Sequence, residues 1–263
     1  MNAHDGDWSQ HPLLASRRRE FLGTPLHALT MQETLAIADE AMASGHRLHH
    51  IVVNVSKLVN MRRNAELHED VVTADVVNVD GKGVLWGARL FGHSLPERVT
   101  GIDVMTNLFS LCEKRGYRPF LLGAEGDVLD AVLQRLAKAH PHLSVAGAQD
   151  GYFRDDQEAA IVDAINASGA DCLFVAMPTP RKERFLKKYR AALKPSFVMG
   201  VGGSFDVYGG KVARAPKIIQ AIGLEWLFRV GQEPKRLWRR YYDTNTAYAV
   251  LLWQEFWGHR SRR

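Results

Sequence analysis

The sequence predicts an α/β fold: a Rossmann-like, mostly parallel sheet with helices on both faces, followed by a helical C-terminal appendage. Three observations lead to this prediction. Short apolar runs alternate with amphipathic segments through most of the chain, as in parallel sheets joined by crossover helices. Some runs, such as 172–176, are apolar at every position, as strands buried on both faces require. From Pro216 onward the pattern is helical only.

The expected elements follow one another in a regular order. The polar, aperiodic residues 1–20 are expected to be flexible. A helix over 30–44 begins at Thr30, with which Glu33 completes a capping box. Strands are then expected over 48–54, 75–79, 119–122, 144–147, 171–176 and 196–201. Helices are expected over 58–69, 83–90, 102–114, 128–139, 157–168 and 182–193.

The composition is that of an ordinary globular protein. The 263 residues allow one large domain with an appendage, and 46% of them are hydrophobic. We therefore expect a flexible N-terminus (1–20), an α/β domain (21–210) and a helical appendage (211–263). Cys112 and Cys172 lie in apolar segments without metal-like spacing, which indicates buried free thiols in a reducing compartment. Neither a secretory signal nor a membrane-spanning run is expected, since the longest apolar candidate, 247–253, is far too short.

The positive charge is concentrated at the C-terminal end. Residues 207–263 hold 11 Lys and Arg against 4 Asp and Glu, a net charge of +7 in a chain of +5. Four of the six tryptophans also lie there. Basic residues interleaved with Trp and Tyr suit an anionic membrane surface, with nucleic acid as the competing partner. On a helix, Arg229, Arg236, Arg239 and Arg240 would form one basic stripe for phosphate or membrane; a merely solvated face is the alternative.

Polar residues and glycines follow several of the expected strands. Asp80 and Gly81 end the strand over 75–79, where an α/β enzyme presents a base, although Asp-Gly is also a common turn pair. Glycines at such turns let backbone N–H groups approach a phosphate, or serve turn geometry alone. Other candidates at strand ends are Asn54, Gly123, Gly202, Gly203 and Asp206. There is no GxGxxG or Walker motif, so a dinucleotide or P-loop site has weak support.

Two cations outside the basic tail are further candidates. Arg98 suits a phosphate, because a guanidinium fork matches its oxygens, or it pairs with Glu97 on the surface. Lys182 belongs to a charged run, 181–184, that opens a helix; such runs are mostly solvated faces. No metal site is expected: Asp5-Gly6-Asp7 resembles a Mg²⁺-holding DxD motif, but it lies in the N-terminal segment and is interpreted as accidental.

The residues from about Phe21 to Tyr241 resemble the WecG/TagA/CpsF family of bacterial glycosyltransferases. Seven motifs carry the resemblance, at 79–84, 95–103, 151–153, 200–206, 214–216, 223–227 and 232–240. The resemblance implies inverting, metal-independent transfer from a UDP-sugar to a polyprenyl-diphosphate-linked sugar at the cytoplasmic face of the inner membrane, with no cofactor. The nearest relatives suggested are xanthan-type exopolysaccharide glucosyltransferases, which add glucose to a lipid-linked glucose.

The resemblance also implies residue roles. Asp80 is then the general base, Arg98 a phosphate or acceptor contact, and Asp206 a neighbour of the nucleotide. Arg229, Arg236 and Arg239 then lie on an appendage that closes over the active site at the membrane. Two departures fall where donor or acceptor would bind: Lys182 replaces a glutamine, and Val52-Val53-Asn54 replaces Thr-Xaa-Asn.

Two other functions remain open at this stage, a nucleotide-dependent Rossmann-type oxidoreductase and a non-catalytic protein that binds membrane or nucleic acid through its basic tail. A homo-oligomer is also left open. The resemblance favours the transferase, with a membrane partner and no nucleic acid.

Overall fold

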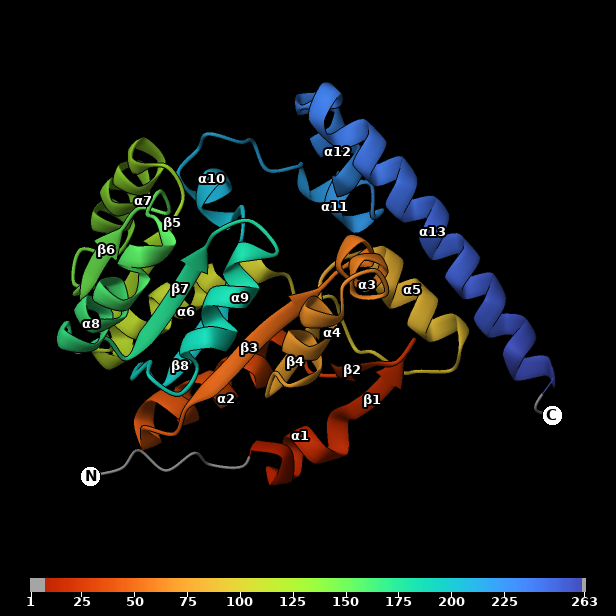
Figure 1. Cartoon of the computed structure of the whole chain (residues 1–263), viewed down its shortest axis with the longest axis horizontal. Coiled ribbons are helices and arrows are strands. Elements are labelled where there is room, and N and C mark those ends of the chain that lie inside the picture. Colours follow the sequence, from red (N-terminus) through yellow and green to blue (C-terminus); the bar gives the residue numbers. More distant parts are fainter. Residues whose placement is uncertain (1–7, 262–263) are drawn as a thin grey trace.

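A computed structural model of the chain describes residues 8–261, with side chains through residue 257, and confirms the predicted α/β class (Figure 1). Its centre is a six-stranded sheet in the order β4-β3-β8-β7-β5-β6, in which every pairing is parallel. The strands are β3 (Leu48–Val53), β4 (Val76–Val79), β5 (Pro119–Gly123), β6 (Gly147–Gln149), β7 (Cys172–Ala176) and β8 (Phe197–Gly200). Most of these positions are buried, which explains the unbroken apolar runs.

Helices cover both faces of the sheet, as predicted. One face packs against α2 (Met31–Ser44), α6 (Gly101–Arg115), α7 (Gly126–Ala139) and α10 (Ser204–Tyr208) in one continuous core. That core holds Cys112 and Cys172 as buried free thiols, as expected. The other face carries α3 (Val55–Met61), α4 (Ala65–Val72), α5 (Lys82–Leu90), α8 (Glu158–Ala167) and α9 (Arg181–Tyr189). Here the core divides into two apolar clusters, one under β3 and β4 and the other under β5, β7 and β8.

The N-terminal segment differs from its predicted flexibility. Residues 8–20 belong to a 3₁₀ helix η1 (Trp8–Gln10), a helix α1 (Pro12–Arg17) and a strand β1 (Arg18–Phe21) that pairs antiparallel with β2 (Thr24–His27). Trp8 and Leu14 are buried against the α2 side of the core, and the Trp8 indole donates to the Arg47 carbonyl at 2.8 Å. Two isolated anchors produce no periodic pattern, so the prediction was wrong for 8–20. Residues 1–7, with Asp5-Gly6-Asp7, lie outside the described residues.

Two predicted boundaries also needed correction. The helix expected over 58–69 is two helices. The first ends at Met61, and Asn64 caps the second, its Oδ1 accepting a hydrogen bond from the Leu67 N–H at 2.9 Å. The strand expected over 144–147 begins only at Gly147, where an added Cβ would lie 2.6 Å from the Phe120 ring. A close approach of β6 to β5 therefore fixes its position.

The C-terminal helices follow the sheet as predicted and are α11 (Lys217–Ala221), α12 (Glu225–Gln232) and α13 (Pro234–Ser261). Helix α13 runs along α3 and α5, while α11 and α12 lie at the carboxyl edge of the sheet (Figure 1). Tyr248 fixes α13 in place: it is buried in the core cluster under β3 and β4, and its hydroxyl donates to the Gly83 carbonyl at 3.1 Å. A Cβ on Gly87 would lie 2.1 Å from that hydroxyl, so the contact requires glycine. Within the described part of the chain, none of the helices is long and apolar enough to cross a membrane.

Candidate active site

Asp80 lies at the carboxyl edge of the sheet, directly after β4. Its backbone N–H donates to the Val53 carbonyl at 2.8 Å, and its carboxylate accepts a hydrogen bond from the Gly101 N–H at the start of α6. Gly81 follows with a φ of +107°, a conformation that favours glycine. The turn then leads into α5 at Lys82. Strand end, glycine turn and helix start thus hold one partly buried carboxylate between two helix N-termini.

The surroundings of Asp80 shift the pKa of its carboxyl toward neutral pH. Burial, and after it the nearby Glu225 carboxylate, raises the pKa of the Asp80 carboxyl to about 6. Arg98, Arg229 and the Gly101 N–H act in the opposite direction. A carboxylate with this pKa is ionised at pH 7 and remains basic enough to accept a proton during a reaction.

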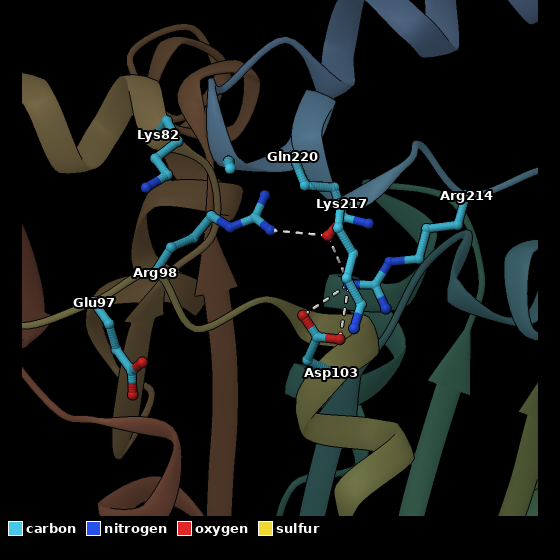
Figure 2. A pocket seen from close by; sticks show the side chains of 8 residues that line it. Lys82, Glu97, Arg98, Asp103, Arg214, Lys217 and Gln220 are labelled. Carbon is cyan, nitrogen blue, oxygen red and sulfur yellow. Dashed lines mark hydrogen bonds and ion pairs between the residues drawn. The ribbon is translucent and has the colours of Figure 1, made fainter.

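An open pocket of about 460 Å³ lies between the core and the appendage. Asp80 does not line it, but Arg98, which acts electrostatically on Asp80, does. Figure 2 shows Lys82 and Arg98 on one side and Arg214, Lys217 and Gln220 on the other. Four cationic side chains therefore face the pocket, against the carboxylates of Glu97 and Asp103. Such an excess of positive charge suits an anion with several oxygens, such as a diphosphate.

Arg98 connects the core to the appendage. Its Nη1 lies 2.8 Å from Oε2 of Glu225 on α12, and its Nη2 donates to Oε1 of Gln220 on α11 at 3.3 Å. The surface pair with Glu97 that the sequence left open is absent here, since Glu97 instead accepts a hydrogen bond from the Met31 N–H. Arg214 pairs with Asp103 at 2.7 Å. The pocket is thus closed on one side by charged contacts between segments more than a hundred residues apart.

A second group of predicted residues meets at the ends of β5, β7 and β8. Gly123 has a φ of +119°, and a Cβ there would lie 2.5 Å from the Ala176 carbonyl oxygen, so the two strand ends approach closely. Gly202 and Gly203 form the turn into α10, which carries Asp206. Burial raises the pKa of the Asp206 carboxyl, and Lys211 and Arg236 lower it. At this point in the strand order the β5 and β7 connections leave in opposite directions, which is where open α/β sheets bind ligands.

The predicted basic stripe is not one stripe. Helix α12 ends at Gln232, and α13 begins at Pro234. Proline suits the first position of a helix but does not continue a helix that is already formed, so the chain breaks between α12 and α13. Arg229 therefore acts on Asp80, and Arg236 acts on Asp206. Arg236 also pairs with Glu233, and Arg239 is exposed on α13. The appendage thus supplies one arginine to each group of site residues.

Two other candidates have structural partners of their own. Asn54 caps α3, its Oδ1 accepting the Lys57 N–H at 2.9 Å. Lys182 is buried rather than solvated, and its Nζ lies 3.0 Å from Oε1 of Glu183, which is also 3.3 Å from the Lys57 Nζ. The Lys182 ammonium lies close to the Gly202 turn: a Cβ added to Gly202 would be 4.0 Å from the Lys182 Nζ. Direct contact of Asn54 or Lys182 with a substrate stays a prediction.

Sequence reasoning missed several residues of the pocket. They are Lys82, Asp103, Arg214, Lys217 and Gln220, together with Glu225, which does not line the pocket but pairs with Arg98. Four of these residues lie inside motifs that the sequence already identified, and those motifs could have indicated them: Lys82, Asp103, Arg214 and Glu225. The motifs do not include Lys217 and Gln220. Within the described residues, no group of three or more His, Cys, Asp or Glu side chains is placed to hold a metal ion.

Comparison with known proteins identifies a family for the chain. The family model described as "Glycosyl transferase WecG/TagA/CpsF family" matches residues 19–262, nearly the whole chain. The match includes the sheet, both groups of site residues and the appendage.

Proposed function

Because the chain belongs to the WecG/TagA/CpsF family of glycosyltransferases, which act in cell-surface glycan synthesis, we propose that it moves a sugar from a UDP-sugar to a polyprenyl-diphosphate-linked sugar. The proposed reaction inverts the anomeric centre, needs no metal ion, and belongs to exopolysaccharide or related glycan synthesis, with glucose as one candidate sugar. The observation that carries the proposal is Asp80, a carboxylate whose pKa is raised to about 6 and on which Arg98 of the cationic pocket acts electrostatically.

Asp80 is the general base of the proposed reaction. An acceptor hydroxyl attacks C1 of the donor sugar while its proton passes to the Asp80 carboxylate. The bond from C1 to the UDP oxygen breaks, and the electron pair leaves with UDP. One displacement at C1 inverts that carbon, so a single base is sufficient and no covalent sugar–enzyme intermediate is required.

The cations of the pocket carry the diphosphate charge. Arg98 lies in electrostatic contact with Asp80, so a phosphate held by its guanidinium lies close to the reacting hydroxyl. Lys82 and Lys217 have no ion-pair partner among the described residues and supply further positive charge. Fixed cations of this kind stabilise charge that develops on a leaving group without the need for a metal. Arg236 and the Gly202–Gly203 turn suit the second phosphate-bearing substrate near Asp206.

The appendage supports attachment to an anionic membrane at the cytoplasmic face. Its exposed large apolar side chains are Ile218, Ile222, Leu224, Leu227, Trp238, Tyr242, Val250, Trp253, Phe256 and Trp257. Tryptophan and tyrosine favour the headgroup region, and each nearby Lys or Arg adds about 1 kcal/mol of attraction to anionic lipid. A peripheral enzyme held this way would reach a lipid-linked acceptor without crossing the bilayer.

The test is a transfer assay with defined substrates. Purified protein is incubated with a panel of UDP-sugars and a short-chain polyprenyl-diphosphate glucose, and the products are identified by mass spectrometry. We expect one donor to give a disaccharide lipid whose new linkage shows inverted configuration by NMR. Transfer from none of the donors, or retention of configuration, would contradict the proposal.

A further inference from the structure

Glu225 is the contact between the appendage and the proposed catalytic centre. It lies in the first turn of α12, and its carboxylate reaches Arg98, which precedes α6 in the core. The pair is largely shielded, with 13% of the Arg98 side chain and 22% of the Glu225 side chain exposed. The Coulomb attraction within a shielded ion pair is stronger than within a surface pair, because water screens it less.

The second appendage contact uses the same arginine. Oε1 of Gln220 accepts a hydrogen bond from Arg98 at 3.3 Å and another from Arg214 at 3.3 Å, while Nε2 donates to the Ala215 carbonyl at 2.7 Å. Gln220 is thereby oriented with its oxygen toward both guanidinium groups. One carboxylate and one amide oxygen of the appendage therefore bind two of the four cations that face the pocket, Arg98 and Arg214.

A carboxylate and a phosphate make the same kind of contact with a guanidinium group. Arg98 can present its fork to Glu225 or to a diphosphate in the pocket, but the two anions repel each other when both are close. Lys82 and Lys217, by contrast, face the pocket without an ion-pair partner among the described residues. Entry of a diphosphate thus breaks the Arg98–Glu225 pair, whereas Lys82 and Lys217 can bind the diphosphate without losing an ion pair.

We propose that Glu225 is a positioning residue that competes with the substrate diphosphate for Arg98, so that diphosphate binding releases the start of α12 from the core. The inference rests on the proposed function, which supplies a diphosphate substrate. It gives the appendage a specific role, because the same contact that holds α12 near the core is exchanged when the substrate binds.

The competition also reaches the base. Glu225 is the charged group that raises the pKa of Asp80 most after burial, while Arg98, Arg229 and the Gly101 N–H lower it. Replacing Glu225 with glutamine keeps the shape but removes that contribution. The acid limb of the kcat/KM profile, expected near pH 6 in the wild type, then moves to lower pH. A purely structural role would lower activity without moving this limb.

The direct test measures binding of inorganic pyrophosphate by calorimetry at pH 7.5. We expect Glu225→Gln to bind it about tenfold more tightly than the wild type, as loss of a shielded competitor worth about 1.4 kcal/mol requires. Asp243→Asn is the matched control, because it removes one negative charge from an exposed position of α13 and should leave the affinity unchanged. Equal or weaker binding by Glu225→Gln would overturn the proposal.

A second variant tests the competition in the opposite direction. Gln220→Glu adds a carboxylate facing the same two arginines, and it should weaken pyrophosphate binding relative to the wild type. Unchanged or tighter binding by this variant would also overturn the proposal, even where Glu225→Gln fails to fold. Absence of transfer from every UDP-sugar would instead contradict the proposed function and leave the pyrophosphate comparison intact.

Discussion

Asp80→Asn separates the proposed catalytic role of this partly buried carboxylate from its effect on stability. The amide is nearly isosteric but cannot accept a proton from the acceptor hydroxyl, so transfer should be lost while UDP still binds. The same change should stabilise the fold. Burial and Glu225 raise the pKa of Asp80 from 3.8 to about 6, which means that the folded protein disfavours the ionised form.

The size of the stabilisation follows from that pKa. At about 1.36 kcal/mol per pH unit, the difference between 3.8 and about 6 corresponds to about 3 kcal/mol, an upper limit because Asp80 is only partly buried. Between pH 3.8 and 6 the folded carboxyl keeps a proton that the unfolded one has lost, so wild-type stability falls as the pH rises through this window. Above pH 6 the full penalty applies, and below 3.8 it vanishes.

Urea unfolding of wild type and Asp80→Asn at pH 4 and pH 8, beside a transfer assay, checks both parts. The free energies of unfolding should nearly coincide at pH 4, with the variant more stable at pH 8. A variant that is less stable at pH 8 would show that the ionised carboxylate is held favourably by Arg98, Arg229 and the Gly101 N–H. Near wild-type turnover in Asp80→Asn would show that another group is the base.

Three further predictions follow from the site and its supports. Transfer should continue in excess EDTA, because fixed cations carry the diphosphate charge; loss of turnover that Mg²⁺ or Mn²⁺ restores would refute this. Gly87→Ala should reduce the free energy of unfolding by about 1–3 kcal/mol, since the new Cβ meets the Tyr248 hydroxyl, and an unchanged urea midpoint would argue against this docking of α13. Lys182→Gln should flatten the rise in stability from pH 8 to 10: burial and Lys182 lower the Lys57 pKa to about 8, so the wild type gains stability as Lys57 loses its proton. An equally steep rise in the variant would rule out this coupling.

The parallel sheet could be predicted from the sequence because its strands are buried on both faces and its helices on one. Both patterns are periodic and need no knowledge of tertiary contacts. The ordered structure of the N-terminal segment could not be predicted in this way, since Trp8 and Leu14 anchor it through contacts with distant parts of the core. The break between α3 and α4 rests on a single capping residue, Asn64, inside a segment whose apolar spacing looks continuous.

The candidate site was predictable where it depends on strand ends. Four of the predicted residues lie at or shortly after the ends of strands, and parallel topology brings their backbone positions to one edge: Asp80, Gly123, Gly202 and Asp206. The identity of the ion-pair partners was not predictable, because Glu225 meets Arg98 across 127 residues of intervening chain. Lys182 illustrates the same limit: its charged neighbours suggested a solvated run, whereas helix α9 turns it inward against Glu183.

The appendage reaches both groups of site residues from one short stretch of chain. Arg229 acts on Asp80, and Arg236, seven residues later, acts on Asp206. The break at Pro234 makes this possible, because a continuous helix would place both arginines on one face and direct them to one place. Tyr248 then fixes the remainder of α13 against α5 and Gly83. A displacement of α12 therefore changes the electrostatic environment of Asp80, because Glu225 and Arg229 both lie on that helix. Arg236 lies on α13, which Tyr248 fixes, so the environment of Asp206 is unaffected and the two groups of site residues respond independently to the position of α12.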